Sequence, residues 1–424
     1  MRRSDTLLGT SREAPDAGTE TAALLQRAGA IRQFGSGLYG FLPAGERVRR
    51  KIVARVRSAM EGLGAQAVSL PALQYRPIWD ASGRWANFED EMFTLANRDG
   101  QDMCLAPSHE EGAVHLLDGV VRSHEDLPVL LYQVTEKYRD DHARNGLVRC
   151  KAFTMKDAYS FHLDEAGLAS TYERVREAYR SAFDDLGVTV TTVTADEGVM
   201  GGSTSEEFVA PVADGTVELL SCSSGDCDFA ATDEHDAYDA LVADGSCPEC
   251  GGALRHTGGI EVGHIFQLGT RYSEAMDLAV DAPEGRRLVR MGSYGIGVTR
   301  VLQTLVQQHG SADGCRWPVT DWGSVAPVRA AVVPLEYAGE YRSVADDLYE
   351  AIGPDDALLF DDRDQSIGER FAESALLGVP ATVVIGNHYD RAGTVEVEYR
   401  DGTTEAVAPE AVPETVERFA AGAE

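Results

Sequence analysis

The chain has 424 residues, of which 43% are hydrophobic and 25% charged, so it is globular rather than disordered and is long enough for two or three domains. The formal net charge of −31 argues against a protein that coats nucleic acid through bulk charge, and any contact with RNA must use local basic patches. No stretch is apolar and long enough for an export signal or a membrane span. With seven cysteines, an odd number, these features predict a protein of the reducing cytoplasm with no membrane partner.

The first region, up to about residue 215, mixes long amphipathic helices with short strands. Residues 64–71 predict a strand that ends at Pro71, and residues 168–187 predict a helix that ends at Gly187. Residues 45–64 predict another helix, with an apolar face formed by Val48, Ile52, Val53, Val56 and Met60.

The second region, residues 216–258, is rich in acids, turns and cysteines. Cys222 and Cys227 form a C-x4-C pair, and Cys247 and Cys250 form a C-x2-C pair. Two such thiol pairs on turns predict a structural zinc site, because zinc prefers four thiolates in a tetrahedron. The alternative is two reduced pairs that bind nothing. The other cysteines, Cys104, Cys150 and Cys315, are predicted to be small packed side chains.

The C-terminal region follows a predicted linker at residues 317–328. Apolar strands are predicted at residues 328–335, 357–362 and 381–386, and helices at 341–353 and 369–378. This alternation is typical of βαβ units and predicts a separate α/β module. The alternative for this module is a generic small α/β domain.

Three polar stretches are candidates for chemistry, although each is weak when taken alone. In "MGSYGIGVTR", residues 291–300, the glycines allow close approach of a ligand and Arg300 suits a phosphate. Ser108 and Glu110 are expected on the same side of an extended segment, where they could hold an ammonium group; the plainer interpretation of Glu110 is a helix cap. "MKDAYSFH", residues 155–162, predicts a half-buried strand.

"YRDDHARNGLVRCKAF", residues 138–153, holds two arginines and an aromatic residue. It is either a solvated hairpin with ion pairs or a nucleotide site. In their order along the chain, these stretches resemble the motifs of a class II aminoacyl-tRNA synthetase. "SGLYGFLPAGERVRRKI", "GAQAVSLPALQ" and "SGRW" resemble motif 1, which forms the dimer interface in this class; residues 138–153 resemble motif 2, and "GSYGIGVTR" resembles motif 3.

Three further stretches resemble signatures of the bacterial-type prolyl enzyme within this class: "MKDAYSFH", "GGSTSEEF" and "GIEVGHIFQLGTRYSEA". The resemblance runs from about residue 21 to the C-terminus. It implies an α/β (α+β) fold with a catalytic domain over residues 1–322, built on an antiparallel sheet with helices, and an anticodon-binding domain over residues 326–424. Residues 216–258 would stand in place of the large editing domain of longer relatives.

The resemblance implies a chain that activates proline with ATP and transfers it to tRNA(Pro). The catalytic residues would be Arg139, at the α-phosphate and the substrate carboxylate, and Arg300, toward the γ-phosphate. Phe153 would stack on adenine opposite Arg300, Asp141 would accept from its amino group, and Arg149 would hold the outer phosphates. Mg²⁺ would bridge the phosphates.

The same matching implies an amino-acid pocket in which Ser108 and Glu110 hold the imino nitrogen. Its remaining residues would be Arg139, Met155, Asp157, Tyr159, His264, Phe266, Gln267 and Ser293. A pocket of this kind separates substrates that differ by a methylene by only about 1–3 kcal/mol. The resemblance implies that alanine would be activated in error. A short form without an editing domain would leave correction to a separate protein. Motif 1 implies a homodimer.

Some positions depart from the family pattern, and they leave two alternatives open. One is a paralogue in a biosynthetic or self-resistance pathway that charges proline or a proline analogue. The other is a non-catalytic tRNA-binding homologue, which the presence of Arg139, Phe153 and Arg300 disfavours. The departures are Ser108 for Thr, Asp141 for Glu, Lys151-Ala152 for Arg-Glu, Ser293 for Cys and Ser366-Ile367 for Arg-Pro.

Overall fold

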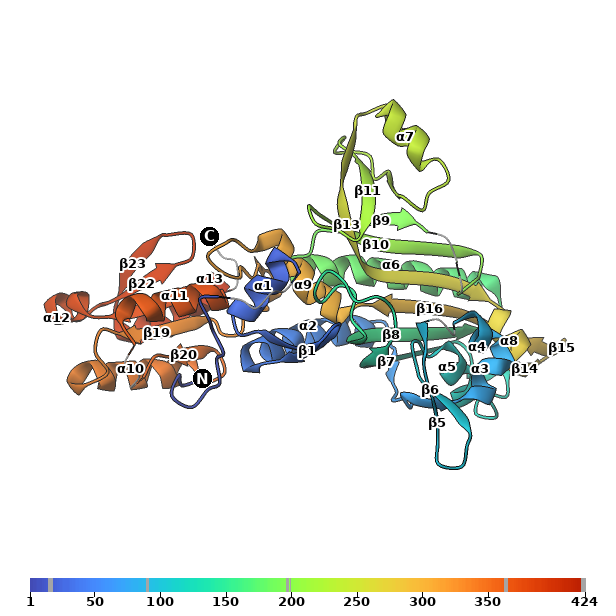
Figure 1. Cartoon of the computed structure of the whole chain (residues 1–424), viewed down its shortest axis with the longest axis horizontal. Helices are drawn as coiled ribbons and strands as arrows, with labels where there is room; N and C mark the ends of the chain where they lie inside the picture. Colours follow the sequence, from blue (N-terminus) through green and yellow to red (C-terminus); the bar gives the residue numbers. More distant parts are fainter. Residues whose placement is uncertain (14–17, 89–90, 196–197, 199, 362–364, 421–424) are drawn as a thin grey trace.

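The computed structural model describes residues 1–13, 18–88, 91–195, 198, 200–361 and 365–420. Two sheets lie at opposite ends of the long axis of the molecule (Figure 1). The larger has nine strands, mostly antiparallel, in the order β12-β11-β13-β16-β8-β7-β3, with β10 and β9 beside β13. These strands are β3 (Gln66–Ala67), β7 (Val129–Tyr138), β8 (Ala152–His162), β9 (Thr191–Thr194), β10 (Thr204–Val212), β11 (Val217–Cys222), β12 (Ala230–Thr232), β13 (Leu254–Gly269) and β16 (Arg290–Ile296).

Three helices pack against this sheet and against each other around one hydrophobic core: α2 (Pro43–Gly62), α6 (Glu165–Leu186) and α9 (Val298–His309). The two helices predicted at residues 45–64 and 168–187 are confirmed as α2 and α6. On α2, Val48, Ile52, Val56 and Met60 are buried, and Val53 is half-buried. Gly187 ends α6 with a left-handed φ of 72°, a conformation that glycine adopts without strain.

The strand predicted at residues 64–71 is mostly wrong. Only Gln66–Ala67 is a strand, and it pairs in parallel with β7. The chain then leaves this sheet, and β4 (Leu73–Tyr75) joins a different, three-stranded sheet with β6 (Asp102–Leu105) and β5 (Phe93–Ala96). Three short helices lie beside this smaller sheet: α3 (Arg76–Ser82), α4 (Arg84–Asn87) and α5 (Glu110–Leu117).

The second large sheet has the order β20-β19-β21-β22-β23, with β19 parallel to both neighbours and the last two strands antiparallel. The strands predicted for this module are confirmed in shorter form, and the two helices are confirmed but each begins two residues earlier and ends one residue earlier than predicted. Asp362, at the end of one predicted strand, lies outside the described residues. The elements are β19 (Ala330–Pro334), β20 (Ala357–Leu359), β21 (Ala381–Ile385), β22 (Val395–Tyr399), β23 (Thr404–Val407), α10 (Gly339–Ile352), α11 (Ile367–Leu377), α12 (Asn387–Ala392) and α13 (Val412–Ala420).

The segment predicted as a linker, residues 317–328, runs between α9 and β19. It contains a short hairpin of β17 (Val319–Thr320) and β18 (Gly323–Ser324). Trp317 is buried and donates a hydrogen bond of 2.9 Å from Nε1 to the carbonyl of Leu377. The N-terminus also reaches this end of the molecule, because Arg2 bridges to Leu359 of β20.

The remaining elements are α1, α7 and α8, the strands β1, β2, β14 and β15, and two 3-10 helices, none of which enters the two large sheets. None of the helices in the described part of the chain combines the length and the apolar character that a membrane crossing needs. These elements are α1 (Glu20–Arg27), β1 (Ile31–Gly35), β2 (Leu38–Phe41), η2 (His124–Asp126), α7 (Tyr238–Asp244), α8 (Arg271–Ala275), β14 (Ala279–Ala282), β15 (Gly285–Leu288) and η3 (Pro409–Ala411).

Candidate active site

A cavity of about 620 Å³ opens on the face of the nine-stranded sheet, between β7, β8, β13 and β16. Most of the residues predicted for an active site line it, and they come from segments far apart in the sequence. Those that line the cavity are Ser108, Glu110, Arg139, Met155, Asp157, Tyr159, His264, Phe266, Ser293 and Arg300. Those predicted that do not line it are Asp141, Arg149, Phe153 and Gln267.

Strand register explains why these residues meet. Ser293 of β16 pairs with Phe266 of β13 on one side and with Tyr159 of β8 on the other. Two residues along, His264 and Asp157 occupy the corresponding positions on either side of Gly295. Since alternate residues of a strand point to the same face, both rows face the cavity.

Glu110 lies at one side of the cavity in a cluster that shares a single guanidinium. Arg84 Nη1 is 3.1 Å from a carboxylate oxygen of Glu110 and 3.0 Å from one of Glu111. Arg84 Nη2 donates to Ser108 Oγ at 2.8 Å, and Ser293 Oγ donates to Glu110 at 3.0 Å. Burial raises the pKa of Glu111, whereas Arg84 offsets the effect of burial on Glu110 and lowers its pKa.

The expectation that Ser108 and Glu110 share an extended segment is wrong, because α5 begins at Glu110. Two acidic residues in the first turn suit the positive end of a helix, so the local sequence favours a helix start there. The structure nevertheless directs Glu110 into the cavity, where it contacts Ser293 and Arg84. Glu110 is therefore both a first-turn residue of α5 and part of the cavity wall.

Asp157 forms the centre of a second buried group. It lies 2.8 Å from Lys137 Nζ and accepts hydrogen bonds from Gln133 Nε2 at 2.9 Å and from Tyr159 Oη at 2.8 Å. Burial would raise the pKa of Asp157, but Lys137 lowers it below its usual value. These contacts hold the carboxylate charged and fix the Tyr159 ring.

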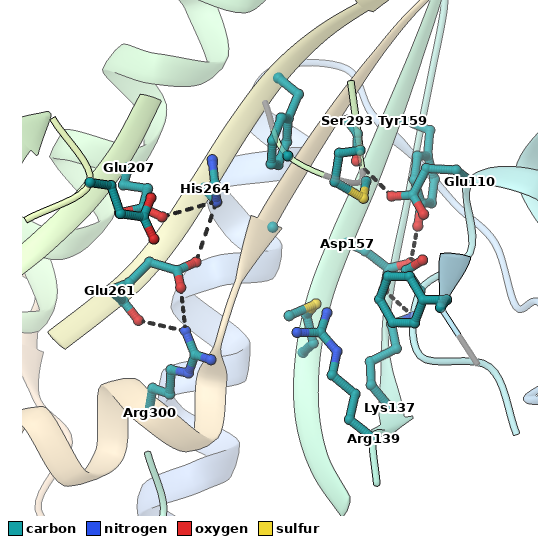
Figure 2. A pocket seen from close by; sticks show the side chains of 18 residues that line it. Glu110, Lys137, Arg139, Asp157, Tyr159, Glu207, Glu261, His264, Ser293 and Arg300 are labelled. Carbon is teal, nitrogen blue, oxygen red and sulfur yellow. Dashed lines mark hydrogen bonds and ion pairs between the residues drawn. The ribbon is translucent and has the colours of Figure 1, made fainter. Parts of the chain in front are cut away.

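A third group, on the other side of the cavity, links Glu207, His264, Glu261 and Arg300 (Figure 2). Arg300 Nη1 is 2.7 Å from Glu261 Oε2, and His264 Nδ1 is 3.4 Å from Glu207 and 3.6 Å from Glu261. Burial and the carboxylate of Glu261 raise the pKa of Glu207 to about 9. The ligand atoms of Glu207, Glu261 and His264 lie within 4.8 Å of one another, so these residues could hold a divalent cation.

Arg139 enters the cavity from the segment after β7. Its guanidinium lies 5.5 Å from the ring centroid of Phe153, and its Nε and Nη2 are each 3.4 Å from the carbonyl of Pro107. Burial, with help from the like charge of Arg300, lowers the pKa of Arg139. The hydrogen bonds found for Arg139 are thus long contacts to one carbonyl, which leave its donors suited to an anionic ligand.

The loop between β7 and β8 has the ion pairs expected of a solvated hairpin. The two strands form an antiparallel hairpin, and Arg149 pairs with Asp141 at 3.0 Å while Lys151 pairs with Asp140. Asp141 and Arg149, both predicted to bind ATP, thus bind each other. Phe153 packs against the hydrophobic core, with Arg139 rather than Arg300 over its ring.

Several residues of the site were missed in the sequence, although they stand in or beside the stretches singled out there. Arg84 belongs to "SGRW", which was expected at a dimer interface, yet Arg84 is fully buried against Glu110 and Glu111. Glu207 stands in "GGSTSEEF" and Glu261 in "GIEVGHIFQLG". Their charge and position in those stretches were the available signals. Gln267 follows Phe266 in the same strand, where adjacent side chains point to opposite faces.

The four cysteines of residues 216–258 come together as predicted, away from this cavity. The Sγ atoms of Cys222 and Cys250 are 3.5 Å apart, and those of Cys227 and Cys247 are 3.7 Å apart. All four sulfur atoms lie within 4.8 Å of one another. The arrangement suits a single metal ion bound by four thiolates.

Comparison with known proteins identifies the family. Residues 93–309 match the sequence model described as "tRNA synthetase class II core domain (G, H, P, S and T)", and residues 329–418 match "Anticodon binding domain". The chain is 35% identical to "Proline--tRNA ligase" of Maricaulis maris over 449 aligned positions, which cover 100% of this chain and 99% of that protein. The chain belongs to the proline–tRNA ligase family. It is therefore a class II aminoacyl-tRNA synthetase, and this family uses ATP and Mg²⁺ in general.

Two further proteins are also similar to this chain. "Probable proline--tRNA ligase, mitochondrial" of Schizosaccharomyces pombe is 35% identical over 382 positions, covering 89% of this chain and 88% of that protein. The crystal structure of prolyl-tRNA synthetase from Cryptosporidium parvum, complexed with halofuginone and AMPPNP, matches the fold with a TM-score of 0.75 at 16% identity. That match covers 98% of this chain and 78% of the other, so the fold is shared over almost the whole chain.

Proposed function

We propose that this chain condenses proline with ATP to form prolyl-adenylate and then transfers the prolyl group to tRNA(Pro). The observation that supports this most directly is the charge pattern of the cavity. On one side Glu110 and Glu111 share the single positive charge of Arg84, so two carboxylates face one cation. The positively charged secondary ammonium of proline would balance the remaining negative charge. Arg139 and Arg300 supply the positive charge that a carboxylate and phosphates need.

The proposed reaction is an in-line attack of the proline carboxylate on the α-phosphorus, with pyrophosphate as the leaving group. Little proton transfer is needed, so the rate depends on positioning the reactants and neutralising charge. Arg139 would contact both the carboxylate and the α-phosphate. Arg300 would exchange its ion pair with Glu261 for the γ-phosphate when ATP binds.

The ATP residues Asp141, Arg149 and Phe153 stay a proposal. Asp141 and Arg149 would have to exchange their mutual ion pair for the adenine amino group and the outer phosphates. Glu207 and Glu261 would hold Mg²⁺ through carboxylate oxygens, and the ion would supply charge neutralisation on the phosphates. Mg²⁺ prefers oxygen ligands, so these two carboxylates fit it better than the four thiolates of the cysteine cluster would.

The proposed proline pocket is lined by apolar and polar groups around Ser108 and Glu110: Met155, Asp157, Tyr159, His264, Phe266 and Ser293. Gln267, which does not line the cavity, would border it only through its neighbour Phe266. The ring of proline would lie against Phe266 and Met155. Such walls gain only about 1–3 kcal/mol for each methylene they contact. Because alanine is smaller than proline and lacks two of its ring carbons, it can enter the pocket, and we expect it as a weaker competing substrate.

We also propose that the chain lacks editing in cis. Its match to "Proline--tRNA ligase" of Caldicellulosiruptor saccharolyticus extends over 549 aligned positions, more than the 424 residues of this chain. That relative therefore has additional residues, which supports a short form here. Correction of mischarged tRNA would fall to a separate protein. The proposed domains are residues 1–322 for catalysis and 326–424 for the anticodon.

A homodimer remains a proposal. The β1–β2 hairpin of the motif 1 region exposes two large apolar side chains: Phe34 is 79% exposed and Leu38 is 42% exposed. A second copy would cover them. The proposed compartment is the reducing cytoplasm, and the proposed structural zinc ion would be held by Cys222, Cys227, Cys247 and Cys250.

The test is amino-acid-dependent ATP–pyrophosphate exchange by the purified chain, with proline, alanine, azetidine-2-carboxylate, pipecolate, hydroxyproline and cysteine. Strong exchange with proline is the expected result. Exchange with an analogue but not with proline would replace the proposal by that of a specialised paralogue. No exchange with any of the six would favour a non-catalytic tRNA-binding homologue.

A further inference from the structure

The strand β13 connects the cysteine cluster to the active-site cavity. Its first part, Leu254–Gly259, pairs with β11 in a hairpin that projects from the body of the molecule together with α7 (Figure 1). Its second part lies between β10 and β16 and contributes Glu261, His264 and Phe266 to the cavity. One continuous strand therefore joins the hairpin to the site.

The projecting module, residues 221–258, has almost no hydrophobic core. Only Ala231, Thr232 and Cys247 are buried in this range. The helix α7 has no buried residue at all. A segment of this size cannot bury enough apolar surface to hold itself together, and natural proteins use a metal ion or disulfides in such cases.

The module also touches the cavity directly. Glu234 lines the cavity, although it stands in the turn after β12, within the module. The turn is tied back to β11 because the Asp233 N–H donates to the Glu218 carbonyl at 3.2 Å.

The four sulfur atoms have the spacing of a metal site and not of disulfides. A tetrahedral zinc ion with bonds of about 2.3 Å holds its sulfur ligands roughly 3.8 Å apart. The observed distances of 3.5 Å for Cys222–Cys250 and 3.7 Å for Cys227–Cys247 are close to this value. A disulfide would bring the sulfur atoms to about 2.0 Å.

The backbone around the cluster also suits thiolates. The N–H of Ser224 donates to Cys222 Sγ, and the N–H of Gly252 donates to Cys250 Sγ, both at 3.4 Å. Such contacts stabilise the negative charge of metal-bound sulfur. A Cβ atom at Gly252 would lie 3.2 Å from one sulfur and 3.4 Å from the other, so a glycine lets the chain pass close to the cluster.

We infer that the four cysteines hold one zinc ion, and that this ion clamps the outer ends of β11 and β13 so that β13 and Glu234 keep their places at the cavity. Four sulfur donors with no oxygen donor favour zinc over magnesium or calcium. The effect on catalysis rests on the proposed function, whereas the clamp itself does not. The proline–tRNA ligase reaction would thus depend on an ion that never contacts a substrate.

The test uses the full-length chain, purified in the presence of a reductant. We expect about one zinc ion per chain by elemental analysis, and a thiolate-to-metal charge-transfer spectrum after exchange for Co²⁺. The double variant Cys247→Ser/Cys250→Ser should lose the ion and the spectrum. Cys315→Ala, which removes a thiol outside the cluster, should keep both.

Amide hydrogen exchange tests whether the zinc ion holds β11 and β13 in place. Loss of the ion should speed amide exchange in residues 254–262 by about tenfold or more and leave β19 and β21 unchanged, because local unfolding is confined to the part that loses its support. The proline-dependent exchange rate, expressed as kcat/KM, should fall by about tenfold, as for loss of supporting contacts at other metal sites.

Four results would overturn the inference: no bound metal, iron in place of zinc, two disulfides found by mass mapping, or unchanged exchange in residues 254–262 after metal loss. A wild-type chain that activates no amino acid would refute the proposed function alone. The metal content, the cobalt spectrum and the hydrogen exchange would still test whether a zinc ion clamps β11 and β13, because none of these measurements needs enzymatic activity.

Discussion

Ser293 Oγ lies 3.0 Å from a carboxylate oxygen of Glu110, although 183 residues separate them in the chain. The hydroxyl comes from the middle strand of the cavity floor and the carboxylate from the start of α5. This contact joins the sheet to the helix that we propose binds the imino nitrogen. It also fixes one of the two carboxylate oxygens, so the orientation of Glu110 depends on Ser293.

The substitution Ser293→Ala should therefore weaken proline binding. A hydrogen bond to a charged group contributes about 1.5–3 kcal/mol, so KM for proline should rise by about tenfold or more. kcat should change less, because Ser293 does not contact the proposed reacting atoms. Pyrophosphate exchange over a range of proline concentrations measures both. Ser293→Cys should restore part of the loss, and an unchanged KM in Ser293→Ala would contradict the role.

The substitution Arg84→Leu should destabilise the fold severely. Arg84 is fully buried and forms ion pairs with both Glu110 and Glu111, so its removal leaves two buried carboxylates without that cation. Breaking a buried ion pair in this way costs about 3–5 kcal/mol of the free energy of unfolding. Urea denaturation measures the loss.

The matched control for Arg84→Leu is Arg76→Ala on the preceding helix. Arg76 forms exposed ion pairs with Asp80 and Asp102, which are worth about 1 kcal/mol or less. An equal loss in both variants would show that burial of Arg84 is not the cause.

The substitution Arg139→Lys should abolish most activity and leave stability nearly unchanged. Lysine keeps the charge but lacks the planar fork that can bind a carboxylate and a phosphate together. We expect kcat/KM for proline-dependent exchange to fall by about a hundredfold or more. The hydrogen bonds that this substitution removes are long ones to the Pro107 carbonyl, so the urea midpoint should shift little. Arg287→Ala, on the exposed β15, should retain full exchange.

Binding of Mg²⁺ should strengthen as the pH rises toward 9. Glu207 has a pKa raised to about 9, so it is protonated near neutral pH and must lose its proton to bind a cation. Calorimetric titration of Mg²⁺ at several pH values should show proton release with the wild type. Glu207→Gln should bind more weakly and lose this pH dependence, and Glu284→Gln, an exposed carboxylate, should behave as the wild type.

The raised pKa of Glu207 also predicts how the free energy of unfolding depends on pH when no metal ion is bound. Because the pKa of Glu207 is higher in the folded state than the ordinary value of 4.5, the folded state binds more protons between these pH values. Its contribution to stability is complete below about pH 4.5 and is lost as the pH rises toward 9. Glu207→Gln should show a smaller loss of unfolding free energy over this range, measured by urea denaturation, and an equal loss would contradict the assignment.

The sequence by itself determined the family and the elements whose signals are local. The helices α2 and α6 were predicted because their buried residues recur at the helical period and because Gly187 can end a helix in the left-handed conformation. The cysteine cluster was predicted because the ligands of a thiolate site come in close pairs along the chain. In both cases the residues that carry each signal are only a few positions apart in the sequence.

The tertiary structure alone decided where the chain changes sheet and which charges meet. Residues 64–71 have the composition of a strand, but strand pairing needs a partner, and only Gln66–Ala67 finds one on β7. The pairings of Arg84 with Glu110 and of Arg300 with Glu261 join residues from different elements. No local pattern encodes such pairs, because the register between strands and the packing of helices on the sheet bring them together only after folding.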